Sequence, residues 1–142
     1  MGNPLVTTVK DIMIRDAATV EYSRSGEAAA KLMAKKKISE IIVTDETKPI
    51  GIITEKDFVL KIIAKGIDPK SITVKDFMSS PLVTVSPDTE LGDAAALMSQ
   101  KGIRRLLVLE KERIVGIVTS DALIRNLSKY ISRLFSEYCY VP

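Results

Sequence analysis

The stretch Thr8-Val9-Lys10-Asp11-Ile12-Met13 returns 65 residues later as Thr73-Val74-Lys75-Asp76-Phe77-Met78. The same offset places Gly51-Ile52-Ile53-Thr54 on Gly116-Ile117-Val118-Thr119. Self-similarity at a fixed period indicates a structural unit that cannot bury its own apolar face, so that the copies stack and share a core. The chain is therefore a tandem repeat, and two copies create a seam between them.

Each copy is expected to contain a strand, a helix, two strands and a second helix. Apolar residues three or four positions apart indicate the helices, and short apolar runs rich in β-branched residues indicate buried strands that pair as a hairpin. The last helix meets no breaker before Pro142 and should be longer than its counterpart, which Gly66 and Pro69 end. The expected strands lie near 19–20, 41–43 and 50–54, and near 84–85, 106–109 and 114–119; the expected helices begin near 25–26 and 57, and near 87–89 and 121.

These elements predict an α+β fold in which two tandem β-α-β-β-α repeats pack with pseudo-two-fold symmetry. The first repeat is assigned to residues 8–65, a linker to 66–72, the second repeat to 73–130, and a C-terminal helix extension and tail to 131–142. Half of a 142-residue chain would bury only about 60% of its unfolded surface, which is marginal for independent folding. We therefore expect one domain with internal symmetry.

Composition narrows the possible functions. The chain has no histidine and a single cysteine, Cys139, so it lacks the commonest general base, the commonest transition-metal ligand and any internal disulfide. Hydrophobic residues make up 46% of the chain, yet no apolar run approaches the roughly 18 residues that a membrane span needs. We expect a cytoplasmic protein that is not an enzyme and has no metal site.

The repeated motifs resemble those of the cystathionine-β-synthase (CBS) domain pair, or Bateman module. The resemblance covers residues 8 to about 130 and rests mainly on residues 74–78, 101–106 and 51–57. It implies a stand-alone regulatory module that binds an adenosine-containing ligand, such as AMP, ADP, ATP or S-adenosylmethionine, in a cleft between the repeats. It also implies an unknown regulated partner and no chemistry of the module's own.

In the family, each site takes a Thr-x-x-Asp motif from one repeat and its adenine and phosphate contacts from the other. A carboxylate suits ribose hydroxyls, whereas arginines and a helix N-terminus suit phosphate oxygens. The resemblance assigns to site A Thr54, Asp57, Thr73, Met78, Ile103, Arg104 and Arg105. It assigns to site B Thr119, Asp121, Thr8, Met13, Ile38 and Ser39.

The two sites are expected to be unequal. Residues 119–121 read Thr-Ser-Asp, one residue shorter than Thr-Glu-Lys-Asp at 54–57, and Glu40 stands where a second arginine would be needed. Site A should therefore fill first. Without the family context, Thr54 and Asp57 would simply end a strand and cap a helix.

The last helix and the net charge raise two further questions. Phe135, Tyr138 and Tyr140 pack either on the same chain or on another subunit, and family modules pair through helices, so we expect a homodimer. A net charge of +3 and a pI near 9.0 also suit a nucleic-acid-binding protein, which is the alternative function. Dispersed charge and 5% aromatic residues make nucleic acid the weaker hypothesis.

Overall fold

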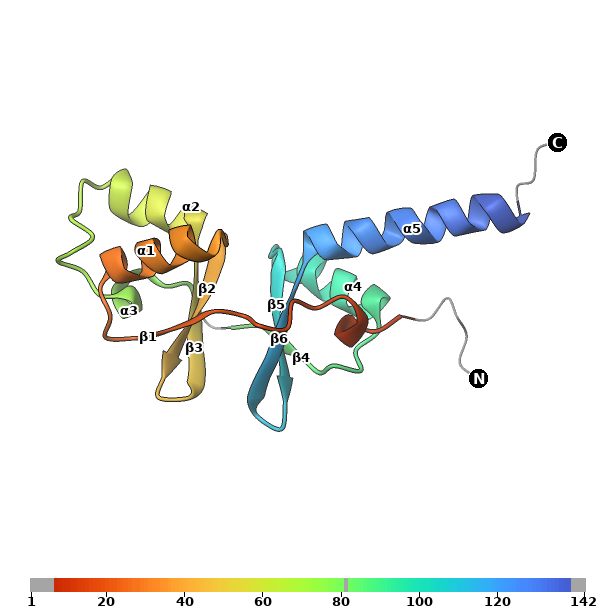
Figure 1. Ribbon diagram of the computed structural model, residues 1–142, viewed down its shortest axis with the longest axis horizontal. Helices are drawn as coiled ribbons and strands as arrows, with labels where there is room; N and C mark the ends of the chain where they lie inside the picture. The colour runs from red at the N-terminus through yellow and green to blue at the C-terminus, as the bar shows by residue number, and fades with distance from the viewer. Residues whose placement is uncertain (1–6, 81, 139–142) are drawn as a thin grey trace. The chain divides into compact units, whose positions relative to one another are not determined.

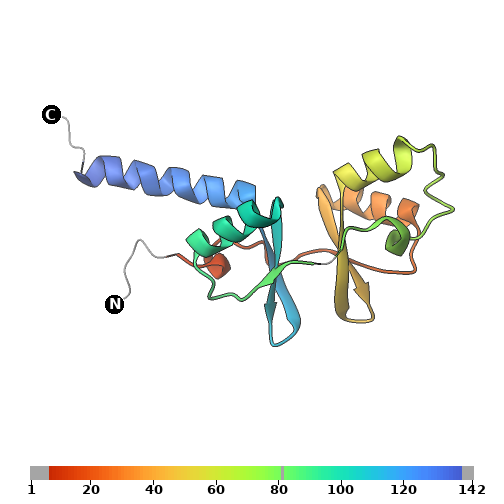
Figure 2. The same ribbon diagram turned by 180° about the vertical axis from the view of Figure 1, so that it is seen from behind.

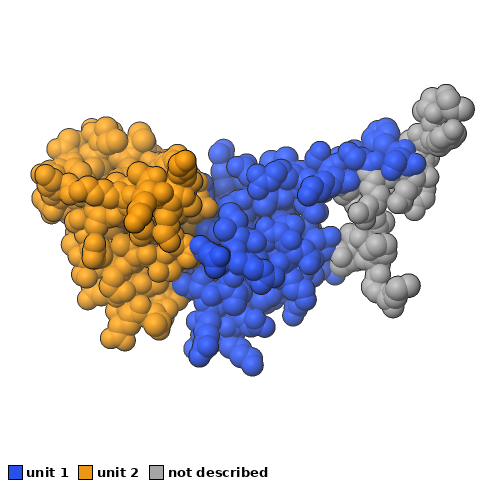
Figure 3. All heavy atoms as spheres, viewed as in Figure 1, with its two compact units in different colours: residues 1–16, 83–142 blue, residues 17–82 orange. Residues whose placement is uncertain are grey.

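The computed structural model describes residues 7–80 and 82–138, with the backbone alone at 130, 133, 134, 137 and 138. The chain forms two compact units: unit 2 contains residues 17–82, and unit 1 contains residues 1–16 together with 83–142 (Figure 3). Each unit holds a three-stranded sheet and helices, so the predicted α+β fold is confirmed. Tyr140 and Cys139 lie outside the described residues.

Unit 2 is built on a sheet in the order β1-β2-β3, with β1 parallel and β3 antiparallel to the central strand. Its elements are β1 (Thr19–Glu21), α1 (Gly26–Lys36), β2 (Glu40–Asp45), β3 (Lys48–Thr54), α2 (Glu55–Asp57), the π-helix η2 (Phe58–Ile63) and α3 (Val74–Phe77). Helices α1 and α2 lie on one face of this sheet (Figures 1 and 2). The expected order of strands and helices is present, whereas α3 is an element that the periodicity does not indicate.

Unit 1 repeats this architecture with a sheet in the order β4-β5-β6. Its elements are the 3-10 helix η1 (Val9–Asp11), β4 (Thr84–Val85), α4 (Leu91–Lys101), β5 (Arg105–Glu110), β6 (Arg113–Thr119) and α5 (Ser120–Tyr138). Helix α5 is longer than its counterpart, as expected. Within the described ranges, no helix is both long enough and apolar enough to cross a membrane.

The two cores are completed by the short motifs that open the repeats. Val74 and Phe77, three positions apart on α3, are buried in unit 2 against Ala29 and Met33 of α1. Val9 of η1 is buried in unit 1 among residues of α4, β5 and β6. The opening motif of each repeat thus packs with the body of the other repeat.

Glycines at two equivalent positions make room for the chain that follows each opening motif. Ser79 pairs with Ile52 of β3 through two backbone hydrogen bonds, of 2.8 and 3.0 Å. A Cβ atom on Gly51 would lie 2.9 Å from Met78 Cγ and still closer to its sulfur, so a residue without a side chain is required where Met78 crosses the strand. Gly116 receives the chain around Met13 in the same way.

Candidate ligand-binding site

The junction between β3 and α2 contains the first candidate pair, Thr54 and Asp57. The Asp57 Oδ2 atom accepts hydrogen bonds from the Thr54 N–H, at 2.9 Å, and from the Thr54 hydroxyl, at 3.4 Å. This is a capping box, in which the side chain at the third helical position satisfies the backbone before the helix. Thr54 and Asp57 therefore do cap the helix.

The second oxygen of Asp57 joins the helix to the segment after α3. Asp57 Oδ1 accepts a hydrogen bond from the Ser79 hydroxyl at 2.9 Å. The same oxygen forms an ion pair with Lys61 Nζ at 3.0 Å. Lys61 Nζ also donates to the backbone oxygen of Phe77 at 3.0 Å. Asp57 is only 6% exposed, and a buried carboxylate requires such partners because burial without them is strongly unfavourable. The Asp57 carboxylate is thus a preorganised hydrogen-bond acceptor, held by the end of β3, by η2 and by the segment after α3.

Burial separates Asp57 from two other carboxylates in the same sequence motif. Thr8 donates its N–H to Asp11 at 3.0 Å, and the Thr73 hydroxyl donates to Asp76 at 2.9 Å. Both aspartates are exposed, and each caps only its own short helix. Thr8 and Thr73 therefore serve as helix N-caps in the structure, whereas Asp57 has partners from outside its own helix.

The corresponding junction in unit 1 is built differently. The Thr119 hydroxyl accepts a hydrogen bond from the Ala122 N–H at 3.2 Å, so a hydroxyl rather than a carboxylate caps α5. Asp121 lies exposed in the first turn of α5. Because the motif at 119–121 is one residue shorter than that at 54–57, the unit 1 junction has a single hydroxyl cap in place of a capping box.

The residues at the start of β2 and β5, the central strands of the two sheets, give the two junctions different charges. In unit 1, Arg105 is paired with Thr119, and the Arg104 carbonyl accepts from the Ser120 N–H at 2.9 Å. In unit 2, Glu40 is paired with Thr54, and the Ser39 carbonyl accepts a hydrogen bond from the Glu55 N–H at 3.2 Å. Two arginines thus stand beside Thr119, and two glutamates stand beside Thr54.

The two predicted residue sets each divide between the units. Unit 2 contains Thr54, Asp57, Thr73 and Met78 of site A and Ile38 and Ser39 of site B; unit 1 contains Ile103, Arg104 and Arg105 of site A and Thr8, Met13, Thr119 and Asp121 of site B. Unit 2 brings Thr54 and Asp57 to the segment of Met78. Thr73 instead pairs with Ser25 at the start of α1.

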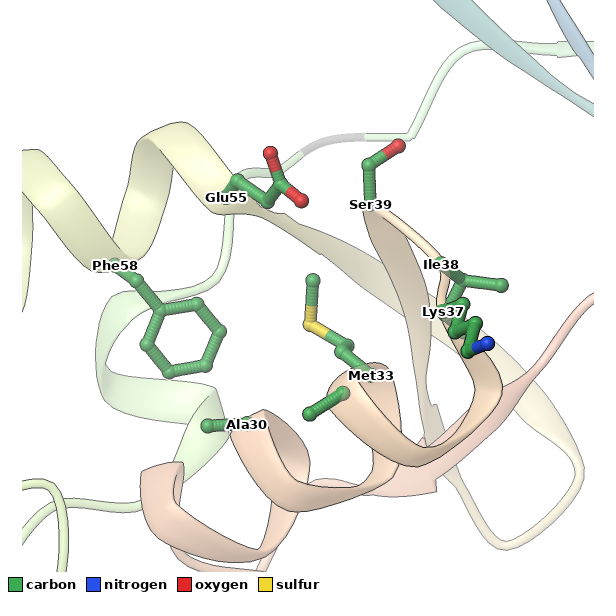
Figure 4. A pocket seen from close by; sticks show the side chains of 8 residues that line it. Ala30, Met33, Lys37, Ile38, Ser39, Glu55 and Phe58 are labelled. Atoms are coloured by element: carbon green, nitrogen blue, oxygen red, sulfur yellow. The ribbon is translucent and has the colours of Figure 1, made fainter.

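A cavity of about 520 Å³ lies beside this junction in unit 2 (Figure 4). Met33 of α1 points into it, with Phe58 on one side and Ile38 on the other (Figure 4). Its polar lining residues are Lys37, Ser39 and Glu55. Ile38 and Ser39, both assigned from the sequence to site B, therefore line the same hollow, on its apolar and its polar side respectively.

Two residues of the junction are absent from the sequence prediction. Lys61 follows Asp57 by four positions on the same helix, a spacing that places side chains side by side and that the sequence does display. Ser79 has no such local signal, because its approach to Asp57 depends on the pairing of its backbone with Ile52. Among the described residues there is no group of three or more acidic, histidine or cysteine side chains arranged to hold a metal ion.

Comparison with known proteins adds independent evidence. The family model described as the CBS domain matches residues 9–64 and 74–129. The chain is 36% identical over 120 residues to the uncharacterized protein MK0525 of Methanopyrus kandleri, covering 83% of this chain, and 35% identical over 121 residues to the CBS domain-containing protein YhcV of Bacillus subtilis, covering 85% of this chain.

A solved structure supports the same assignment. The CBS domain pair of protein MJ0100, crystallised with 5′-methylthioadenosine and S-adenosyl-L-methionine, superposes with a TM-score of 0.79 at 31% identity. The match covers 88% of this chain and 98% of that one. The chain spans 86% of the length of YhcV and 61% of that of MK0525. The two matched segments, the repeated sheets and the superposition agree that the chain belongs to the CBS domain family and carries a tandem pair, a regulatory module.

Proposed function

We propose that this module binds an adenosine-containing ligand and passes its presence to another protein or protein segment, with no catalysis of its own. The observation that carries the proposal is the buried carboxylate of Asp57, which is held at the start of a helix by Thr54, Lys61 and Ser79. The related MJ0100 pair was crystallised with two adenosine compounds, which supports the same ligand class here.

Each proposed contact follows from the chemistry of adenosine. The vicinal hydroxyls of ribose are hydrogen-bond donors that match a carboxylate acceptor, as in dinucleotide sites. The adenine ring needs an apolar surface, and the half-buried Met78 at Gly51 offers one close to the junction. Ile103, Arg104 and Arg105 are proposed to contribute adenine and phosphate contacts, since guanidinium groups match phosphate oxygens.

The residues assigned to site B are proposed to form a weaker second site. Thr119 already accepts a hydrogen bond as the cap of α5, and Asp121 is exposed. Thr8, Met13, Ile38 and Ser39 remain candidate contacts of this site. The proposal includes a homodimer that acts in the cytoplasm on a separate regulated protein.

A thermal-shift screen tests the proposed function. AMP, ADP, ATP, GTP, NAD and S-adenosylmethionine are each added to the purified chain, because a ligand that binds the folded state raises the melting temperature. We expect at least one adenosine compound to stabilise the wild type and Asp57→Asn to abolish most of that shift. Absence of any shift and of any calorimetric binding signal would refute adenosine binding, and a salt-sensitive shift of labelled RNA would favour nucleic acid.

A further inference from the structure

We propose that Lys61 is a latch, a positioning residue that competes with ribose for the carboxylate of Asp57. This inference rests on the proposed function, because it concerns how an adenosine ribose gains access to the same carboxylate. In the structure, Lys61 Nζ lies 3.0 Å from Asp57 Oδ1, 3.0 Å from the Phe77 oxygen and 3.4 Å from Ser79 Oγ. The ammonium group therefore ties η2 to the segment after α3.

The hydrogen-bonding capacity of Asp57 is already filled. A carboxylate has about four acceptor positions, and Asp57 receives the Thr54 N–H, the Thr54 hydroxyl, the Ser79 hydroxyl and Lys61. A ribose brings two further hydroxyl donors. At least one present donor must therefore leave before both hydroxyls bind.

Lys61 is the donor whose departure disturbs the fold least. The Thr54 N–H is fixed in the capping box, and the backbone of Ser79 is fixed on β3. The Lys61 side chain is 38% exposed, against 8% for that of Asp57, and four flexible carbons allow its ammonium to move into water. Ribose and Lys61 thus compete for Oδ1, and the arrival of ribose releases the tie between η2 and residues 77–79.

The test compares Lys61→Met with wild type, using AMP and S-adenosylmethionine as probes in calorimetric titrations. Removing the competitor should tighten both probes roughly three- to tenfold, in keeping with the loss of one partly exposed ion pair. Lys61→Arg should restore near wild-type affinity. The matched control is Arg125→Met, at the corresponding place on α5, with unchanged affinity expected. Unchanged or weaker binding of both probes to Lys61→Met would overturn the latch, and a loss confined to AMP would show that Lys61 binds phosphate instead.

Chemical labelling gives a second readout that a purely structural role would not move. Acetylation of wild-type lysines by an N-hydroxysuccinimide ester, followed by mass spectrometry, should show Lys61 reacting several times faster when AMP or S-adenosylmethionine is saturating. Lys65, exposed two residues after the end of η2, is the internal control. A Lys61 rate that stays constant or falls contradicts the latch. Failure of both probes to bind any variant would instead refute the proposed adenosine site itself.

Discussion

At the scale of single residues, the same Thr-x-x-Asp sequence serves two purposes in this chain. Asp11 and Asp76 cap short helices and remain exposed, whereas Asp57 is buried and bonded to Ser79 and Lys61. Capping alone does not require burial, because an exposed carboxylate satisfies the same N–H groups. The burial of Asp57 therefore marks it as the carboxylate with a role beyond its helix.

Replacing Asp57 by Ala should weaken an adenosine ligand about 10- to 100-fold, since hydrogen bonds to a charged group are worth roughly 1.5 to 3 kcal/mol. Asp121→Ala should have far less effect, because that carboxylate is exposed and the Thr119 hydroxyl caps its helix. Calorimetric titration of both variants with the best ligand of the screen measures the two losses of affinity. Equal losses, or a larger loss for Asp121→Ala, would assign the principal site to the other junction.

Gly116 offers a test of the contact between β6 and the chain after η1. A Cβ atom there would meet the Ile14 carbonyl oxygen and Met13 Cγ, each at 2.9 Å, so Gly116→Ala should destabilise the protein by about 1 to 3 kcal/mol. Gly92→Ala is the matched control, because its added methyl group would meet no atom within 4 Å beyond its chain neighbours and the backbone of its own helix. This helical substitution should be neutral or stabilising by up to about 1 kcal/mol. Urea unfolding measures both, and two effects of equal sign would contradict the steric argument.

The sequence predicts which residues belong to the β3–α2 junction more readily than how they are arranged. The motif at residues 54–57 and its one-residue-shorter counterpart at 119–121 are visible in the sequence. Lys61 is also visible as an i,i+4 neighbour, but its bond to the Phe77 carbonyl is not. That bond, like the Ser79 contact, arises from strand pairing across more than fifteen residues, which no local spacing encodes.

At the scale of elements, the two equivalent helices α1 and α4 end differently. The residue after α1 is Lys37, with φ of 55°, and the residue after α4 is Gly102, with φ of 64°. A left-handed conformation is sterically unfavourable for residues with a Cβ atom and not for glycine. At this helix terminus, the first repeat therefore carries local strain that the second repeat avoids.

Lys37→Gly should stabilise the protein by about 1 kcal/mol, because glycine is the residue best suited to this helix terminus. Lys37→Ala, which removes the charge but retains the Cβ atom, should give no comparable gain. Thermal and urea unfolding of the two variants measure the difference. A gain of the same size in Lys37→Ala would attribute the effect to the lysine charge.

Element length decides what the sequence pattern can predict. The hairpin strands β2, β3, β5 and β6 and the helices α1, α4 and α5 are long enough for their apolar patterns to appear. Helix α3 and the 3-10 helix η1 have four and three residues, less than two turns, so no period can be seen in them. The π-helical winding of η2 also escapes prediction, because residues 58–63 keep an ordinary helical composition.

At the scale of the whole molecule, α5 presents an apolar stripe that the described part of its own unit does not cover. Its large exposed residues recur at intervals of three or four positions and are Ile124, Leu127, Ile131 and Phe135. Such a stripe is expected to be buried in a helix-helix interface. This supports the proposed homodimer.

Light scattering at tens of micromolar protein should give about twice the chain mass of 15.6 kDa. Removal of the residues after Ser128 takes away Ile131 and Phe135 and should weaken the dimer. Arg125→Ala, on the same helix but outside the apolar stripe, should leave the mass unchanged. A monomeric mass for the intact chain would rule out the homodimer at this concentration.

The exchange of opening motifs predicts which fragments fold. A fragment of residues 17–82 retains α3, with Val74 and Phe77 in its core. A fragment of residues 1–66 follows the repeat boundary and lacks both side chains, each lost core residue costing about 2 to 5 kcal/mol. Circular dichroism should show cooperative unfolding for residues 17–82 and none for residues 1–66. Equal cooperativity would mean that α3 is dispensable.

The exchange of opening motifs also affects the order in which the two units can fold during synthesis. The strand partner of Ile14 is Ile117, about a hundred residues further along the nascent chain, and ribosomes add roughly 5 to 20 residues per second. Unit 2, which is continuous in sequence, can form while unit 1 is still incomplete. Ile14 and its neighbours thus wait on the order of 5 to 20 s for their partner strand, and they reach their native position only after unit 2 can already have formed.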